Sequence, residues 1–374
     1  MKIGIVGAGI GGLTVAALLQ EQGHEIQVFE KKARIEDIGA GIGIGDNVIK
    51  KLGDHDLAKG LKNAGHLLES MQISDDQGRL LTEVPFAKET TNLTMLRQSL
   101  IDIIATYVKK ENIHLNEEVI GIHVSETGVA LDFVSGATSH FDLVIGADGL
   151  HSNIRQAIFP DSKVNYQGYT CFRGVVEDMS HLGQVATEYW GQKGRFGIVP
   201  LLNGHAYWFA TMNAKEKDAK YLHYNKPYLQ AYFNHFPEDV RSVLDKQPET
   251  GVLHHDIYDL KPLKTFTYKN RVLLLGDAAH ATTPNMGQGA GQAMEDAILL
   301  SGLLEKYDMA EALKKYNQLR VKHTAKVIKR SRKIGKIAQK EGKLSTALRN
   351  RFMSVLPNQL IANQTKFLNK SKRL

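Results

Sequence analysis

The first thirty residues constrain the fold of this chain more than any other segment. A short apolar run, residues 2–6, is followed by the glycine-rich sequence GAGIGG, residues 7–12, and by an apolar stretch of helical periodicity that ends before Gly23. A second apolar run then ends at Glu30. This order predicts a strand, a tight turn, a helix and a second strand, which together form one β–α–β unit of a parallel sheet.

The glycines of this turn and the acidic residue after the second strand indicate a nucleotide site. Gly7 permits the tight turn, Gly9 lets a pyrophosphate approach the backbone, and Gly12 lets the helix pack closely on the strand. The helix start offers free N–H groups and a positive dipole to phosphate. Glu30 can accept hydrogen bonds from ribose hydroxyls, a role that a ligand-free glycine turn leaves unexplained. The unit therefore predicts a dinucleotide site, for NAD or FAD, formed by Gly7, Gly9, Ile10, Gly11, Gly12, Glu30 and Lys31.

Two later segments repeat the pattern of an apolar strand that enters a turn of small residues. In residues 142–155, DLVIGADGLHSNIR, the strand runs into Asp148 and a helix is expected to begin near Ser152. In residues 271–297, RVLLLGDAAHATTPNMGQGAGQAMEDA, the strand runs into Asp277, and a glycine cluster then opens another helix. At the end of a buried strand, Asp277 can accept from ligand hydroxyls, with a helix N-cap as the alternative.

The three motifs, in this order, resemble the FAD-dependent aromatic hydroxylases, which are single-component flavoprotein monooxygenases with the p-hydroxybenzoate hydroxylase fold. The match includes Arg97 in the segment MLRQSLIDII, residues 95–104, which is expected to be a helix, and the loop at residues 39–53. The sequence GQGAGQAMEDA is similar to the branch with salicylate, 3-hydroxybenzoate 6- and urate hydroxylases and zeaxanthin epoxidases. Many relatives have Trp-Pro-Asn where this chain has Gly45-Asp46-Asn47. The resemblance implies an α/β fold: a Rossmann-like FAD-binding domain with an inserted, mostly antiparallel β-sheet substrate domain and C-terminal helices.

This resemblance extends the expected FAD site beyond the first motif. It implies that Arg97 contacts phosphate or ribityl groups, with a solvated helix charge as the alternative, and that Pro284 lines the flavin ring. Asp148 is implied to help hold FAD, in a motif that the family also links to the nicotinamide cofactor. The helix that begins near Gly289 can direct its N–H groups at the flavin pyrimidine. The additional implied contacts are Arg97, Asp148, Gly276, Asp277, Gly287, Gly289 and Ala290.

The middle of the chain changes character. Between residues 163 and 265, alternating segments rich in Tyr, Phe, Trp and Val predict an antiparallel sheet, and residues 71–84 predict a hairpin that joins it. The FAD-binding domain is then discontinuous. We expect it to comprise residues 1–70, 96–160 and 268–304, with the substrate-binding domain at 71–95 and 161–267 and a basic helical segment at 305–374.

Candidate substrate contacts lie on this sheet, in the cleft expected between the two domains. An Arg at position 195 with a Tyr at position 207 is similar to the pair that urate hydroxylases use to position their substrate. Strand alternation makes about half of the sheet residues face away from any one ligand. The candidates are Arg195, Tyr207, Phe172, Tyr189 and Phe209. For His280 we expect a structural role in the turn, with a general base as the alternative.

The implied reaction needs no nucleophilic side chain, because the cofactor carries the chemistry. NADH or NADPH reduces FAD, and the reduced flavin reacts with O2 to give a C4a-hydroperoxide that hydroxylates a small aromatic or heteroaromatic substrate. The chain has no second GxGxxG motif, so the nicotinamide cofactor is expected to bind transiently. No residue is certain to be catalytic, and no metal is expected.

Other function classes remain open at this stage. Epoxidation or inactivation of an antibiotic is an alternative within the family, and a membrane-associated flavoprotein without oxygenase activity is a non-enzymatic one. A flavin-dependent halogenase is disfavoured because its Trp-x-Trp-x-Ile-Pro motif is absent. An NAD-dependent dehydrogenase would use the first motif alone.

Charge and composition add secondary constraints. The 374 residues include one cysteine, Cys171, which excludes an intrachain disulfide framework. Of the net charge of +7, residues 305–374 hold 19 Lys and Arg against 4 Asp and Glu. We expect a surface helix with one docked face there, ending in a frayed KSKRL, with an attractor for anions as the alternative.

The expected cellular compartment follows from the absence of a recognisable secretory or membrane-spanning segment. The glycine-interrupted start differs from a secretory signal, and no segment is expected to span a membrane. We therefore expect a cytoplasmic monomer or homodimer, without a nucleic-acid partner and without integral membrane association. Its partners would be the small aromatic substrate and O2.

Overall fold

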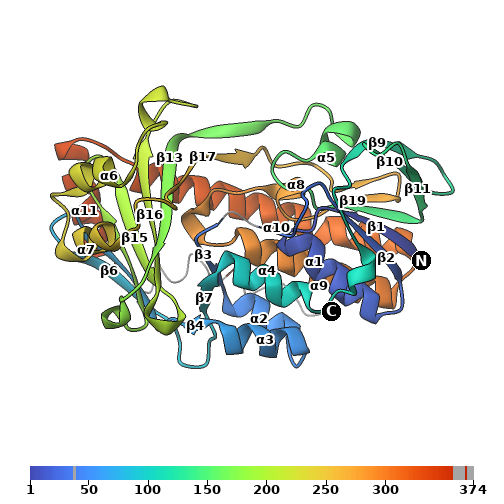
Figure 1. Ribbon diagram of the computed structural model, residues 1–374, viewed down its shortest axis with the longest axis horizontal. Helices are drawn as coiled ribbons and strands as arrows, with labels where there is room; N and C mark the ends of the chain where they lie inside the picture. The colour runs from blue at the N-terminus through green and yellow to red at the C-terminus, as the bar shows by residue number, and fades with distance from the viewer. Residues whose placement is uncertain (37–38, 357–366, 369–374) are drawn as a thin grey trace.

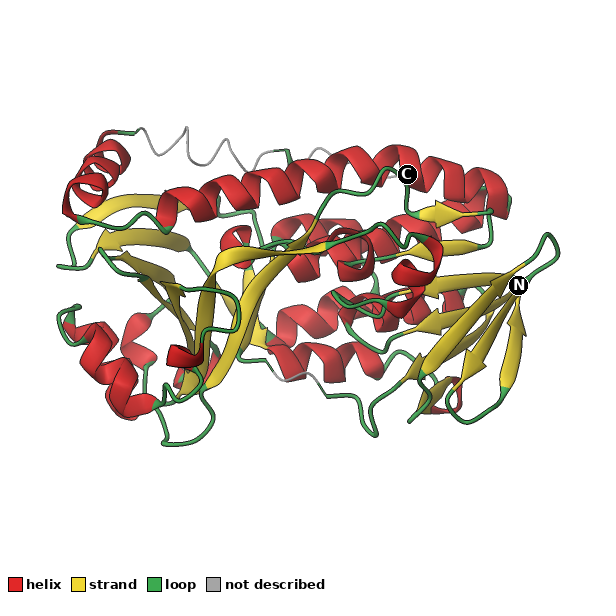
Figure 2. Ribbon diagram, turned by 90° about the horizontal axis from the view of Figure 1, so that it is seen from above, coloured by secondary structure: helices red, strands yellow, loops and turns green. Residues whose placement is uncertain are grey.

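The computed structural model describes residues 1–36, 39–356 and 367–368 of the chain. Two units lie at opposite ends of an elongated molecule, and the long helix α10 (Met309–Ala338) runs along both of them (Figures 1 and 2). One unit is built on a mostly parallel sheet and the other on an antiparallel sheet. The predicted α/β fold with an inserted β-sheet domain is confirmed.

The first unit is built around a six-stranded sheet of short strands, of which the central ones are the most deeply buried. Four neighbouring pairs are parallel, and only the edge pair β18–β19 is antiparallel. In spatial order the strands are β18 (Thr267–Tyr268), β19 (Val272–Leu274), β12 (Leu143–Gly146), β1 (Lys2–Val6), β2 (Glu25–Glu30) and β8 (Ile113–Leu115). Their continuous apolar runs fit a sheet that is covered on both faces.

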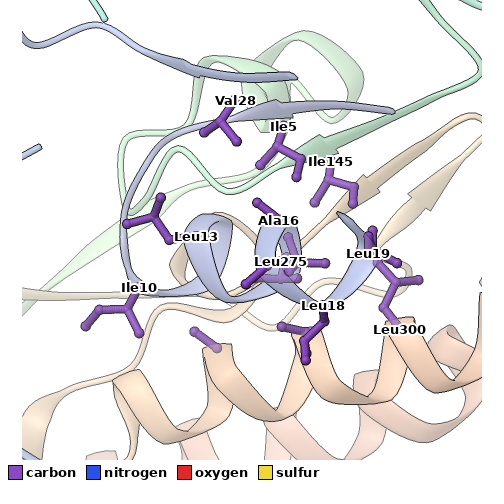
Figure 3. Packing of buried hydrophobic residues seen from close by; sticks show 14 of the residues in the cluster. Ile5, Ile10, Leu13, Ala16, Leu18, Leu19, Val28, Ile145, Leu275 and Leu300 are labelled. Atoms are coloured by element: carbon purple, nitrogen blue, oxygen red, sulfur yellow. The ribbon is translucent and has the colours of Figure 1, made fainter. Parts of the chain in front are cut away.

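Helix α1 (Ile10–Glu21) lies between this sheet and helix α9 (Gly289–Lys306), as Figure 3 shows. Leu13, Ala16 and Leu19 are completely buried, and they pack with Ile5 of β1 and Leu300 of α9. Apolar residues therefore surround α1, and ten of its twelve residues are buried. Burial on all sides explains why the helix carries no charged face.

Smaller elements complete the first unit. Two three-stranded sheets flank it, and the meander β9–β11 among them was not predicted from the sequence. These strands are β9 (Val119–Val124), β10 (Val129–Phe133), β11 (Thr138–Phe141), β3 (Gly41–Ile44), β4 (His66–Leu67) and β7 (Leu93–Leu96). The helices are α2 (Asp46–Leu52), α3 (Asp56–Ala64), α4 (Arg97–Ala105), α5 (Asn153–Ile158) and α8 (Asp277–His280).

The second unit is a seven-stranded sheet with helices on its outer face. The predicted hairpin joins it as β5 and β6, through a parallel pairing of β5 with β14. In spatial order the strands are β17 (Leu253–Leu260), β13 (Val164–Val176), β16 (Ala206–Asn213), β15 (Arg195–Pro200), β14 (Val185–Trp190), β5 (Ser70–Asp75) and β6 (Leu80–Pro85). Helices α6 (Lys226–Phe233) and α7 (Glu238–Lys246) cover the outer face (Figure 1). The expected division of the chain into two domains stays a prediction, and β7, which pairs with β3 in the first unit, begins inside the segment 71–95 that was expected in the substrate-binding domain.

The basic C-terminal segment forms two helices rather than one continuous helix. The chain leaves α10 at Gln339 and passes through Gly342, with φ +88°, before α11 (Lys343–Val355) begins. The predicted docked stripe is buried at Leu313 and Tyr316, whereas Leu319 is 45% exposed. The final KSKRL lies outside the described residues. Within the described residues, no helix has the length and apolar character that a membrane span requires.

Candidate flavin and substrate site

The three sequence motifs meet at one edge of the six-stranded sheet. Strands β1, β12 and β19 are adjacent and parallel, and Val6, Gly146 and Leu274 lie side by side in register. The turns that follow these strands therefore leave the sheet at the same edge. In open α/β sheets, ligands bind outside the carboxyl ends of the strands, so this edge is the candidate cofactor site.

The glycine-rich turn has the shape that a dinucleotide requires. A Cβ atom on Gly12 would lie 1.9 Å from the Gly7 carbonyl oxygen, so only glycine lets the start of α1 pack so closely. Gly7 itself has φ +104°. At Gly9, by contrast, no atom lies within 4 Å of an added Cβ. The open space beside Gly9, at the N-terminus of a buried helix, fits a pyrophosphate.

The end of β2 closes the same loop. The Glu30 carboxylate accepts hydrogen bonds from the backbone N–H groups of Ala8 and Lys32, both at 3.0 Å. Ile10 and Gly11 are buried in the first turn of α1, and Lys31 is exposed beyond the strand. Glu30 thus fixes the glycine loop and stays at its rim. Its contact with a ribose remains a prediction.

Asp148 has a different environment from the one expected of a ligand-facing residue. Its carboxylate accepts from the Ser152 hydroxyl at 2.5 Å and from the Ile154 backbone N–H at 3.2 Å. Ser152 is the N-cap of α5, which begins at Asn153, close to the helix start expected near Ser152. Burial raises the pKa of the Asp148 carboxyl. This side chain holds the turn against α5, so any contact with FAD must coexist with these two bonds.

Asp277 and Arg97 lie at the starts of short helices. Asp277 is exposed as the first residue of α8, and the N-cap position belongs to Gly276, which excludes the N-cap alternative. Its side chain is exposed just after the end of β19, at the edge of the sheet that forms the candidate cofactor site. Arg97 begins α4, and its side chain lies so close to Gly39 that a Cβ there would be 2.4 Å from the Arg97 Cδ.

The loop between α8 and α9 presents an open backbone surface. Pro284 is exposed, Gly287 has φ +60°, and an added Cβ on Gly287 or Gly289 would meet no atom within 4 Å. Helix α9 begins at Gly289, with Ala290 half-buried in its first turn and no acidic residue there. No acidic side chain of this first turn offsets the positive end of the long helix, which fits an electron-rich ring.

His280 belongs to a buried ionic cluster that the sequence did not reveal. Its Nε2 lies 2.5 Å from Asp296 Oδ2, and Arg320 of α10 bonds to the other Asp296 oxygen and to Glu295 at 3.0 Å. Lys51 of α2 also pairs with Glu295, at 2.7 Å. Burial opposes ionisation of Asp296, but Arg320 and His280 hold the pKa of its carboxyl far below the usual range. The structural role expected for His280 fits this position.

The five substrate candidates divide between the two faces of the seven-stranded sheet. Phe172 and Tyr189 face outward: both are buried with α6 and α7, and the Tyr189 hydroxyl donates to Asp239 at 2.8 Å. Arg195, Tyr207 and Phe209 face the flavin-binding unit. An added Cβ on Gly41 of β3 would lie 1.8 Å from the Tyr207 ring. We call this second side the inner face, and only these three candidates can reach a ligand between the units.

Arg195 is occupied by protein partners. Its guanidinium pairs with Glu188 at 2.9 Å and donates to the side chains of Asn285 at 2.8 Å and Gln339 at 2.9 Å. Asn285 in turn donates to the Tyr169 hydroxyl at 3.0 Å. Arg195, at 3% exposure, therefore ties the inner face to the loop that contains Pro284 and to the end of α10. A direct contact with substrate stays a prediction.

Because Tyr189 lies on the outer face of the sheet and Tyr207 on the inner face, we predict different effects for the two Tyr→Phe variants. Tyr189→Phe removes a hydrogen bond on the outer face and should lower the free energy of unfolding by about 1 kcal/mol without changing the substrate KM. Tyr207→Phe should change KM instead, because burial raises the pKa of Tyr207 to about 12 and keeps its hydroxyl as a neutral donor. Chemical denaturation and steady-state kinetics measure the two effects. A raised KM for Tyr189→Phe would contradict the assignment of faces.

Comparisons with known proteins agree with this geometry. A family model described as "FAD binding domain" matches residues 1–331. Aurachin C monooxygenase/isomerase of Stigmatella aurantiaca is 30% identical over 369 residues, which cover 97% of this chain and 96% of that protein. A 2-heptyl-3-hydroxy-4(1H)-quinolone synthase of Pseudomonas aeruginosa is 29% identical, covering 96% and 95%. Klebsiella pneumoniae HpxO, solved with FAD and uric acid, has a TM-score of 0.91 at 26% identity, covering 99% of this chain and 97% of that chain.

Proposed function

The chain belongs to the FAD-dependent aromatic hydroxylases, and from this premise we propose that its substrate is a planar aromatic or heteroaromatic ring that carries an oxygen substituent. The observation that carries the proposal is the inner face. Tyr207 and Phe209 lie on this face, and Arg195 of the same face bonds to Asn285 in the loop of the exposed Pro284. We infer that a flat ring lies between these aromatic side chains and the cofactor site. The boundary between two such units is where small ligands usually bind.

The residues present fit FAD and divide its binding among three loops. When bound, FAD accepts reducing equivalents from NADH or NADPH and activates O2. We propose that the glycine loop and the N-terminus of α1 hold the pyrophosphate, with Glu30 on the ribose. Asp277 would accept from the ribityl hydroxyls. The N-terminus of α9 would stabilise negative charge at the ring end of the cofactor.

The names of the relatives support the substrate class without identifying the substrate. One relative is named for a hydroxyquinolone product, and one structural neighbour contains uric acid. Both compounds are heteroaromatic rings with oxygen substituents. Hydroxylation is thus favoured over epoxidation and over a flavoprotein without oxygenase activity. We further propose that the protein works in the cytoplasm.

A screen of candidate rings tests this proposal. The FAD-loaded protein would be incubated with NADH or NADPH and with salicylate, urate, 4(1H)-quinolone or phenol, and cofactor oxidation and O2 uptake would be followed. At least one ring should stimulate both rates severalfold over the ring-free control. If the protein retains no FAD, or if no ring stimulates either rate, the proposal is wrong.

A further inference from the structure

The inner face carries two arginines, and only one of them has an ion-pair partner among the described residues. Arg195 pairs with Glu188, the acidic side chain of that face. Arg173 of β13 lies in register with Phe209 of β16. No ion pair involving Arg173 is seen in the described part of the chain, and its Nε is buried without a hydrogen-bond partner.

The strand register explains why Glu188 does not form an ion pair with Arg173. Across the sheet, Arg173 pairs with Phe209, Phe209 with Gly197, and Gly197 with Glu188. Two strands therefore separate the arginine from the carboxylate, a spacing of roughly 14 Å at about 4.8 Å per strand. Arg195, two residues from Gly197 on the same strand, pairs with the Glu188 carboxylate instead. One guanidinium on this face is left without a counter-charge.

Arg173 lies in register between Phe209 and Leu253, and its side chain also interacts with the thiol of Cys171. The Phe209 ring lies over Gly197, since an added Cβ there would be 2.2 Å from the ring. Phe209 also contacts the cluster of Tyr169, Cys171 and Ile257. In such surroundings a buried N–H without an acceptor costs about 1–3 kcal/mol, and an anionic acceptor binds a guanidinium more strongly than a neutral one.

We propose that Arg173 anchors the substrate through an anionic oxygen, a carboxylate or an ionised ring oxygen, while the ring lies along Phe209 and Tyr207. The proposal rests on the proposed function and narrows its substrate class to acidic aromatic compounds. An arginine suits this task because its planar fork can bind two oxygens of a carboxylate or one ring oxygen. Arg173 is then a binding residue, and Arg195 is a positioning residue for the Pro284 loop.

The test measures binding to the FAD-loaded protein through the change in flavin absorbance. The probes are salicylate and urate, which are anions at neutral pH, and the uncharged salicylamide and phenol. Wild-type protein should bind an anionic probe more tightly than the uncharged ones. Arg173→Met should raise the Kd of that anion about 10- to 100-fold and leave the Kd of the uncharged probes nearly unchanged. Arg173→Lys should recover part of the loss.

Control variants separate this role from a general effect of charge or folding. Arg241→Met removes a positive charge from α7, on the outer face, and should bind all probes as wild type does. The native flavin spectrum of each variant reports a folded, loaded site. If Arg173→Met fails to load FAD, Arg173→Lys and Arg173→Gln carry the same comparison.

The outcomes also distinguish this proposal from the proposed function. If Arg173→Met binds the anion as tightly as wild type does, Arg173 is not the anchor. If uncharged rings alone bind and stimulate cofactor oxidation, the anionic class is wrong and the proposed function stands. If no ring stimulates oxidation at all, both are wrong.

Discussion

Replacing Arg320 by Met is expected to lower the free energy of unfolding by about 3–5 kcal/mol. Arg320 is 2% exposed and bonds to both Asp296 and Glu295, whose side chains are also buried. The substitution leaves two carboxylates in the interior without their arginine. Asp296 then keeps His280 and the Gly276 N–H, and Glu295 keeps Lys51 and Asn47. The cluster joins α2, α8, α9 and α10, so its loss should loosen the wall behind the flavin site. Denaturant unfolding of the FAD-loaded protein measures the change.

A control on the same helix isolates the effect of burial. Lys314→Met removes an exposed partner of Glu311 and should leave stability nearly unchanged. The pH dependence gives a second check. Because the pKa of Asp296 is depressed in the folded state, its contribution is present above the unfolded value of about 3.9 and is lost as the pH falls towards the folded value. Equal losses for Arg320→Met and Lys314→Met would refute the role of the cluster.

Gly9→Ala should weaken FAD binding about 10- to 100-fold while the apoprotein unfolds as wild type does. An added Cβ at Gly9 meets no protein atom within 4 Å, and φ of −80° suits alanine. The new methyl group would instead occupy the space that we assign to the pyrophosphate. Fluorescence titration of the apoprotein with FAD measures the affinity, and thermal unfolding of the apoprotein measures the fold.

Gly12→Ala serves as the contrasting variant. Its Cβ would lie 1.9 Å from the Gly7 carbonyl oxygen, so it should destabilise the apoprotein itself. The two variants, three residues apart, would then show that Gly9 leaves space for the ligand and that Gly12 is needed for close packing of the helix. If Gly9→Ala binds FAD as tightly as wild type does, the pyrophosphate does not lie against this turn.

The sequence predicted the elements whose structure is determined by a local sequence pattern. The strand before Gly7, the helix after it and the helix start near Ser152 were all predicted, because buried strands, glycine turns and helix starts have local sequence patterns. The start of α4 differs from the prediction. The helix was expected to include Met95, which instead lies in β7, because pairing of β7 with β3 overrides helix propensity there.

The substrate face could not be predicted, for a physical reason. Both faces of the seven-stranded sheet are covered, the outer one by α6 and α7, which were not predicted, and the inner one by the flavin-binding unit. Aromatic residues therefore occur on both faces, and alternation does not tell Phe172 from Phe209. Similarly, Arg320 lies in a segment rich in Lys and Arg, and nothing local marks it as buried.

Isotope labelling tests the central claim, that this chain is a FAD-dependent hydroxylase, most directly. The FAD-loaded protein, NADH or NADPH and the ring that stimulates oxidation most strongly would react under ¹⁸O₂, and the product mass would be measured. We predict that the product gains one oxygen atom and that this atom is ¹⁸O. A product without the label, or cofactor oxidation that yields only hydrogen peroxide with every ring, would contradict the account.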